Sequence, residues 1–234
     1  MPHKVAIIGA GNVGTILGGA LLKSNSSFSI YYGVRGDPST EKYKKLLKKQ
    51  PLAHISTVHD AVNWGEVIIL AVPGAYTDSE IQKVVEGLGP GVACKIVIDV
   101  TNPLSPSYPA LETRIWKHDG ISAGEAFAAA LPKSTFVYKA FNTIGAEHMD
   151  KASDFLPDGQ RLTMLFAGSD DKVKRGVVED VIAGVGFEPA YVGPIRYARN
   201  LEAMAELWIH LGLDGVGETK ENWGRNFHFQ VVRK

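Results

Sequence analysis

The chain is poor in cysteine, with Cys94 alone among 234 residues, so neither an internal disulfide bond nor a cysteine-based zinc site can form. Its seven histidines show no close pairing of the kind that binds zinc, and we therefore predict no metal site. No uninterrupted apolar run reaches the length of a membrane span, and no signal-peptide pattern precedes the first expected strand. These absences predict a cytoplasmic protein without a membrane partner.

The chain also lacks an excess of charge of either sign, because 25 basic residues balance 25 acidic residues. A general nucleic-acid-binding protein neutralises phosphates with a positively charged surface, so we expect no nucleic-acid partner. One basic stretch, Lys42–Lys49, carries apolar residues at positions 43, 46 and 47. That spacing is typical of a surface helix, and we interpret its lysines as a solvated face.

Glycine, in contrast, is plentiful, and three glycines near the amino terminus have an informative spacing. The apolar run Lys4–Ile8 predicts a strand, and Gly9-Ala10-Gly11-Asn12-Val13-Gly14 follows it directly. Residues 15–23 have the pattern of a helix, and Phe28–Val34 that of a second strand. In this setting the G-x-G-x-x-G spacing lets the backbone approach a pyrophosphate and offer it N–H groups at a helix start. We predict a dinucleotide site; the alternative is a glycine-rich turn without a ligand.

Arg35 stands at the tip of the second expected strand and bears on the choice of dinucleotide. An acidic residue at this place accepts hydrogen bonds from the ribose of NAD, whereas an arginine suits the 2′-phosphate of NADP. A guanidinium is always charged and can bond phosphate oxygens through two N–H groups. Ser39, Thr40 and Lys42 follow as further donors. We therefore predict NADP(H). Asp37 is the dissenting residue, since its contact with the ribose in place of Arg35 would favour NAD(H).

The rest of the chain alternates between strand and helix patterns. Helices are expected over Thr57–Trp64, over Asp78–Leu88, after the capping-box sequence Ser122–Glu125, and from Gly168 to about Ala183. Strands are expected over Glu66–Val72, Lys95–Val100, Thr135–Phe141, Leu162–Ala167 and Phe187–Val192. This alternation predicts an α/β protein with a Rossmann-like, doubly wound, mostly parallel sheet and helices on both faces.

The length predicts a single domain over residues 1–212 and a carboxy-terminal tail over residues 213–234. The tail contains Trp223, Phe227 and Phe229, and we expect it to pack either on the domain or on a partner. The oligomeric state stays open. A homodimer is the default, because it is the commonest assembly of soluble proteins.

Ligands of such sheets bind beyond the carboxyl ends of the strands, so the residues at three expected strand exits are candidates. They are small, amide, hydroxyl or proline residues: Ala71, Val72 and Pro73 at the first exit, Asn102 and Pro103 at the second, and Asn142 and Thr143 at the third. Proline fixes a turn, and amide and hydroxyl groups offer hydrogen bonds that suit a nicotinamide. We predict that the exits form the floor under a nicotinamide ring; the alternative is three ordinary turns.

A larger set of motifs runs in order through residues 4–211. They are Ile7–Gly14, Gly33–Arg35, Ala71–Pro73, Asp99–Leu104, Lys139–Ile144, Ala167–Asp171, Val192–Pro194 and Ala198–Glu202. Together they resemble the NADP oxidoreductases that depend on the deazaflavin coenzyme F420, and the related cytosolic domain of the six-transmembrane metalloreductases. The resemblance implies an NADP-dependent oxidoreductase that transfers a hydride between NADPH and a small-molecule redox acceptor, a flavin or F420.

The resemblance also implies residue roles. Gly9, Gly11, Asn12 and Val13, with Ala10 between them, would hold the pyrophosphate, and Arg35 the 2′-phosphate. Val72, Pro73, Asn102, Asn142 and Thr143 would line the nicotinamide and acceptor pocket. Val34 stands where relatives often carry a small polar residue, so some phosphate contacts are expected at Ser39 or Thr40. Hydride transfer needs two stacked ring systems more than a side-chain acid, and we name no catalytic residue.

Two other functions stay open. The first is an NADP(H)-dependent reductase of another small carbonyl or imine compound, which predicts an acid such as His148 or Lys139 in the pocket. The second is a non-catalytic NADPH-binding sensor module, because no acid–base pair is evident. Residues 105–120 form a long connection, which is expected to act as a lid over the acceptor site. Dehydrogenases with an added helical domain are disfavoured, because strands are still expected after residue 150.

Overall fold

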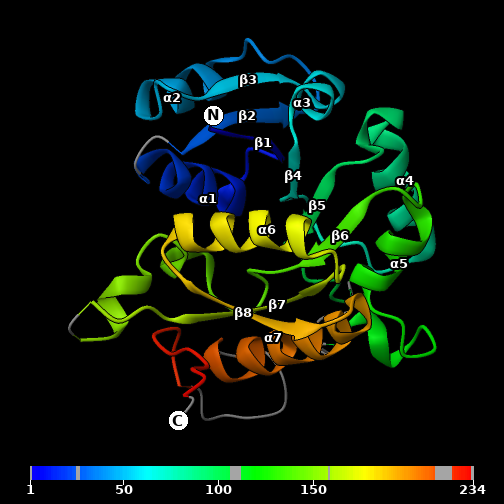
Figure 1. Cartoon of the computed structure of the whole chain (residues 1–234), viewed down its shortest axis with the longest axis vertical. Coiled ribbons are helices and arrows are strands. Elements are labelled where there is room, and N and C mark those ends of the chain that lie inside the picture. The colour runs from blue at the N-terminus through cyan, green and yellow to red at the C-terminus, as the bar shows by residue number, and fades with distance from the viewer. Residues whose placement is uncertain (1, 25–26, 106–111, 158, 214–222, 233–234) are drawn as a thin grey trace.

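Eight strands form one sheet in the computed structural model of the chain, which describes residues 2–24, 27–105, 112–157, 159–213 and 223–232 (Figure 1). The strands are β1 (His3–Ile8), β2 (Phe28–Val34), β3 (His54–Thr57), β4 (Val67–Leu70), β5 (Ile96–Asp99), β6 (Phe136–Lys139), β7 (Thr163–Gly168) and β8 (Glu188–Gly193). Their order is β3-β2-β1-β4-β5-β6-β7-β8. Every neighbouring pair is parallel except β6 and β7, which are antiparallel.

Helices cover both faces of this sheet. They are α1 (Asn12–Lys23), α2 (Glu41–Lys49), α3 (Val58–Trp64), α4 (Asp78–Leu88), α5 (Ala123–Ala130), α6 (Lys172–Val185) and α7 (Ala198–Gly212). Because successive strand residues point to opposite faces, Val5 and Ile7 join a core with α1 and α6, whereas Ala6 and Ile8 join a core with α3, α4 and α5. This is the Rossmann-like α/β fold predicted from the sequence. No helix among the described residues is long and apolar enough to cross a membrane.

Most predicted elements are present, some to the residue. Strand β2 and helix α4 have the expected bounds. Ser122 and Glu125 form the predicted capping box at the start of α5. The sequence patterns do not predict β3, a short edge strand with no buried residue, or the reversed direction of β7. Both features depend on pairing with a neighbouring strand, which local periodicity does not report.

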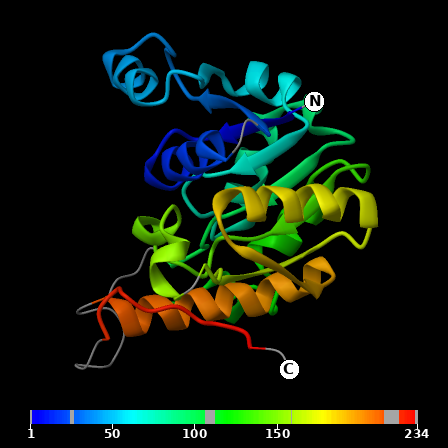
Figure 2. The same ribbon diagram turned by 60° about the vertical axis from the view of Figure 1, so that its left-hand side comes forward.

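The described part of the carboxy-terminal tail, residues 223–232, contacts the domain. Figure 2 shows this segment running beside α7. The indole Nε1 of Trp208 donates to the carbonyl of Phe227 (3.0 Å), and the two rings are stacked. Arg225 binds both carboxylate oxygens of Glu147. These contacts join the described part of the tail to the domain of the same chain.

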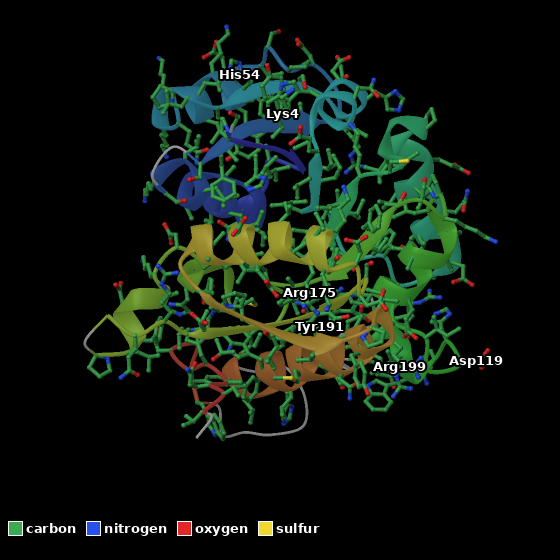
Figure 3. All side chains as sticks on the ribbon, viewed as in Figure 1. Lys4, His54, Asp119, Arg175, Tyr191 and Arg199 are labelled. Atoms are coloured by element: carbon green, nitrogen blue, oxygen red, sulfur yellow. The ribbon has the colours of Figure 1, made fainter. Side chains whose placement is uncertain are left out.

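Charged side chains connect helices at the β8 end of the sheet. Arg175 of α6 lies 4.7 Å from the ring of Tyr191 on β8 (Figure 3). At the start of α7, Arg199 donates from Nε to Glu125 of α5 (3.2 Å). Helices α6 and α7 therefore reach the sheet and α5 through specific polar contacts as well as apolar packing.

Candidate functional site

A pocket of about 590 Å³ lies at the carboxyl ends of β1, β2 and β4, the edge where parallel sheets bind ligands. Seven of the predicted site residues line it: Gly9, Ala10, Gly11, Arg35, Ala71, Val72 and Pro73. The other seven lie outside its lining: Asn12, Val13, Ser39, Asn102, Pro103, Asn142 and Thr143. The structure therefore brings the glycine loop, the tip of β2 and the exit of β4 to one cavity.

The glycines of the loop have different physical reasons for being glycine. Gly9 has a φ of +106°, and a β-carbon on it would collide with the carbonyl oxygen of Ala71. A β-carbon on Gly11 would meet no heavy atom within 4 Å. The protein itself thus requires glycine at position 9, whereas at position 11 a glycine leaves room in front of the loop. That open space is what close approach of a pyrophosphate needs.

The start of α1 leaves backbone N–H groups free for an anion. Its N-cap residue is Gly11, which has no side chain to accept from them, and no acidic residue stands in the first turn. Helices α4 and α5 differ, because each begins with a complete capping box. An uncapped helix N-terminus beside an open glycine fits a bound pyrophosphate.

Three cations and one carboxylate line the pocket. The cations are Arg35, Lys42 and Lys83, and all three are exposed. Arg35 forms no ion pair with a described residue. The carboxylate is that of Glu80, which accepts from the backbone N–H groups of Thr77 and Tyr76 (2.9 Å each). The Thr77 backbone hydrogen bond in particular lowers the pKa of Glu80. The remaining positive charge suits a phosphate in addition to the pyrophosphate.

Asp37 and Ser39 are engaged with each other beside this pocket. The Asp37 carboxylate accepts from the hydroxyl of Ser39 (2.7 Å) and from its backbone N–H (2.8 Å), and these bonds lower the pKa of Asp37. Asp37 does not line the pocket, whereas Arg35 does. The arrangement favours Arg35 as the residue that meets the ribose substituent. It also shows that the Ser39 hydroxyl, predicted as a phosphate donor, has an intramolecular acceptor.

The exits of β4, β5 and β6 adjoin one another. A β-carbon on Gly74 would collide with the carbonyl of Asn102, so the first two exits touch. The Asn102 amide donates to the carbonyl of Asn142 (2.9 Å), and the Asn142 amide donates to Asn102 Oδ1 (3.2 Å) and to Leu201 (2.9 Å). The two asparagines therefore brace the exits against each other. The Asn142 amide thus uses both of its N–H groups inside the protein, whereas the half-buried Asn102 amide uses one of its two.

The two acids proposed for a carbonyl or imine reductase are not open to the pocket. Lys139 is fully buried between Asp99 and Glu202, at 2.8 and 3.0 Å. His148 is buried against the ring of Phe155 and is not part of the pocket lining. Neither side chain can reach a substrate there in this arrangement.

Sequence reasoning missed the roles of Asp99, Glu202 and Arg114. Asp99 and Lys139 end apolar strands, and a charge at such a place needs a partner, which is a signal the sequence does contain. Arg114 is buried in the long connection, where it donates to the carbonyl of Tyr76 (2.8 Å) and to Asp78. The connection is thus attached beside the exit of β4. Residues 106–111, the middle of the predicted lid, lie outside the described residues.

Residues 4–103 match the sequence profile of a family described as NADP oxidoreductase, coenzyme F420-dependent. An F420-dependent NADP reductase of Methanocaldococcus jannaschii is 28% identical over 220 residues, which are 90% of this chain and 92% of that protein. The predicted family resemblance is confirmed. Both matches bear out the predicted enzyme class, an NADP-dependent oxidoreductase, and the predicted cofactor, NADP(H).

Solved structures agree on the fold. A crystal structure from Arthrobacter sp. FB24, of a protein assigned by name to the F420-dependent NADP reductases, superposes with a TM-score of 0.80 at 23% identity. It covers 99% of this chain and 100% of its own. A reductive aminase from Aspergillus terreus in complex with NADPH has a TM-score of 0.59 at 17% identity. The match spans 88% of this chain but only 60% of the aminase, so the aminase has a large part with no counterpart here.

Proposed function

We propose that this protein transfers a hydride between NADPH and a flavin-like acceptor of the F420 type. The single observation that carries the proposal is the pocket in which an open glycine, an uncapped helix start and Arg35 meet the exit of β4. The name of the curated relative, an F420-dependent NADP reductase, supports the same acceptor class.

The residues present fit NADP(H) along the length of the pocket. Backbone N–H groups at Gly11, Asn12 and Val13 would bind the pyrophosphate, and Arg35 with Lys42 would bind the 2′-phosphate. The dinucleotide supplies the hydride from its nicotinamide ring. Val72 and Pro73 would flank that ring, and the exits at Asn102 and Asn142, which adjoin the β4 exit outside the pocket lining, would form its floor. The protein's contribution is orientation and exclusion of water, because the cofactors carry the chemistry.

The sealed position of Lys139 and the burial of His148 outside the pocket lining favour this function over reduction of a carbonyl or imine. Such a reaction needs a proton donor beside the substrate. The fold shared with reductive aminases does not replace that donor, since fold alone does not imply function. A non-catalytic NADPH sensor remains the third hypothesis.

A stopped-flow measurement of NADPH oxidation tests the proposal. The protein is mixed with NADPH under anaerobic conditions and then with F420, FMN, FAD or an imine, with NADH as the control donor. Oxidation that is fastest with F420 or a flavin, and faster with NADPH than with NADH, supports the proposal. Turnover on the imine alone would favour the carbonyl or imine reductase. Tight NADPH binding with no turnover on any acceptor would favour the sensor.

Location and assembly form the finer part of the proposal. We expect the protein in the cytoplasm and as a homodimer, and both stay predictions.

A further inference from the structure

Asp99 and Lys139 lie directly opposite each other where β5 and β6 end, and their side chains are fully buried. The Lys139 ammonium donates to Asp99 Oδ2 (2.8 Å) and to the carbonyl of Thr101 (2.6 Å). The other carboxylate oxygen of Asp99 accepts from the backbone N–H of Thr101 (2.9 Å). Thr101 is therefore held at both its N–H and its C=O by one ion pair.

The chain leaves β6 in an unusual conformation near this pair. Phe141, two residues after Lys139, has a φ of +61° although it is a bulky residue and fully buried. Such a conformation persists only where the surroundings over-determine it, and it is often found at functional sites. The next residue is Asn142, whose amide braces Asn102, the neighbour of Thr101. Both exits of the proposed nicotinamide floor are thus attached to the same ion pair.

Stability alone does not account for buried charges at this place. A buried ion pair can often be replaced by well-packed apolar residues without loss of stability, because desolvation offsets the attraction between the charges. What apolar residues cannot do is hold a backbone N–H and a carbonyl in fixed directions. The Asp99–Lys139 pair fixes the directions of the Thr101 N–H and C=O. It does so beside the exits of β5 and β6, which the proposed function uses.

Lys139 stays charged in this environment. Burial by itself would lower the pKa of its ammonium, but Asp99 and Glu202 raise it overall. All of its contacts are acceptors inside the protein, so it has no proton to give to a substrate. This separates a role in positioning from the role of an acid.

We propose that the Asp99–Lys139 pair is a positioning clamp: by holding Thr101 it fixes the floor formed by Asn102 and Asn142, and so sets the placement of the nicotinamide ring. The proposal rests on the proposed function, because it concerns the same site. The clamp would act on hydride transfer and on the ring's surroundings, and would leave the affinity set at the phosphate end unchanged.

Asp99→Asn is the test variant, because it removes the carboxylate that holds Thr101 while Lys139 keeps Glu202 as a partner. Glu202→Gln is the matched control. It makes the same change of charge in the same buried cluster, but its carboxylate contacts the backbone N–H groups of Ala123 and Gly124 and does not touch Thr101. Lys95→Met is a second control. It removes a lysine attached to carbonyls of Val62 and Asn63, near the amino end of β5.

The first readout is amide hydrogen exchange of the free protein over residues 100–102 and 140–143. We expect at least tenfold faster exchange there in Asp99→Asn, and less than twofold change in both controls. This measurement needs neither cofactor nor turnover, so it tests the clamp even if the proposed function fails. Unchanged exchange in Asp99→Asn, or equal changes in Asp99→Asn and Glu202→Gln, would overturn the clamp.

The second readout is bound NADPH, measured by nicotinamide emission, by its dissociation constant and by single-turnover oxidation. In Asp99→Asn we expect the emission to move toward that of free NADPH and hydride transfer to slow at least tenfold. The dissociation constant should change less than twofold, and the pH profile should keep its shape. Parallel loss of affinity and rate, or a new pH dependence, contradicts positioning. If wild-type protein oxidises no NADPH with any acceptor, the proposed function fails, and emission with hydrogen exchange still decides the clamp.

Discussion

The two halves of the site use charge in opposite ways. At the β1–β2 end, Arg35 is exposed, and helices α1 and α2 begin without side-chain caps. At the β5–β6 end, Asp99 and Lys139 are sealed from solvent, and α5 begins with a capping box. The first half offers hydrogen-bond donors to a ligand, whereas the buried ammonium of the second half donates only to acceptors inside the protein.

This difference shows what each half is suited to do. Unpaired cations and free N–H groups bind an anion, and they can do so without a rigid environment. A buried pair whose hydrogen bonds are satisfied has little left for a ligand, but it fixes the backbone around it. Affinity should therefore depend mainly on the first half, and geometry and stability on the second.

The largest effect is expected from removing the buried cation. Lys139→Met leaves Asp99 and Glu202 as two uncompensated buried carboxylates, so the free energy of unfolding should fall by about 3–5 kcal/mol. Urea unfolding followed by circular dichroism measures this loss. Lys95→Met, before the amino end of β5 and partly exposed, should lose about 1 kcal/mol. Equal losses in the two variants would mean that the buried ammonium of Lys139 contributes no more to stability than the partly exposed Lys95.

Arg35→Ala comes next and tests the exposed half. NADPH binding should weaken by about 1.5–3 kcal/mol, the range for a hydrogen bond to a charged group, and NADH binding should stay nearly unchanged. Titration calorimetry with both dinucleotides measures the difference. Equal losses for NADPH and NADH would show that Arg35 does not touch the 2′-phosphate.

Gly11→Ala separates ligand binding from folding. Because no protein atom lies within 4 Å of the added β-carbon, the melting temperature should fall only by the small cost of alanine at an N-cap, while NADPH should bind about tenfold more weakly. Gly176→Ala, in α6 and equally open, is the control. It should stabilise the protein by about 0.5–1 kcal/mol without affecting binding. Unchanged NADPH affinity in Gly11→Ala would show that the glycine loop does not contact the bound dinucleotide.

The smallest effect concerns the tail and acidic pH. Burial, with a smaller contribution from His148, lowers the pKa of His228 from 6.5 to about 4. A detached tail binds a proton below about pH 6.5, and the packed tail does so only near pH 4, so packing is fully stable above pH 6.5 and weakens as the pH falls toward 4.

Hydrogen exchange of residues 223–232 at pH 7 and pH 5, corrected for the intrinsic rate, measures that weakening. His228→Phe keeps an aromatic ring against Phe155 but cannot be protonated, so its tail should stay protected at both values. The same acid sensitivity in this variant would assign the effect to another group.

Local patterns were informative wherever a local rule governs the structure. The G-x-G-x-x-G run, the capping box of α5 and the bounds of β2 and α4 follow from short-range sterics and hydrogen bonding, and their predictions agree with the structure. The asparagines at the exits were named from residue type, but their mutual hydrogen bonds were not foreseen. Those bonds depend on the spacing of β5 and β6 and on α7.

The sequence by itself determined the class of fold, the glycine loop and the arginine that follows β2, because each depends on patterns within continuous stretches of residues. Only the tertiary structure decided that Lys139 is sealed between two carboxylates, that Arg114 reaches the carbonyl of Tyr76, and that Glu202 reaches α5 from α7. The physical reason is that the position of a charged residue in the sequence does not identify the group that its side chain contacts. Whether it faces water, a ligand or another charge is settled only when distant segments pack together.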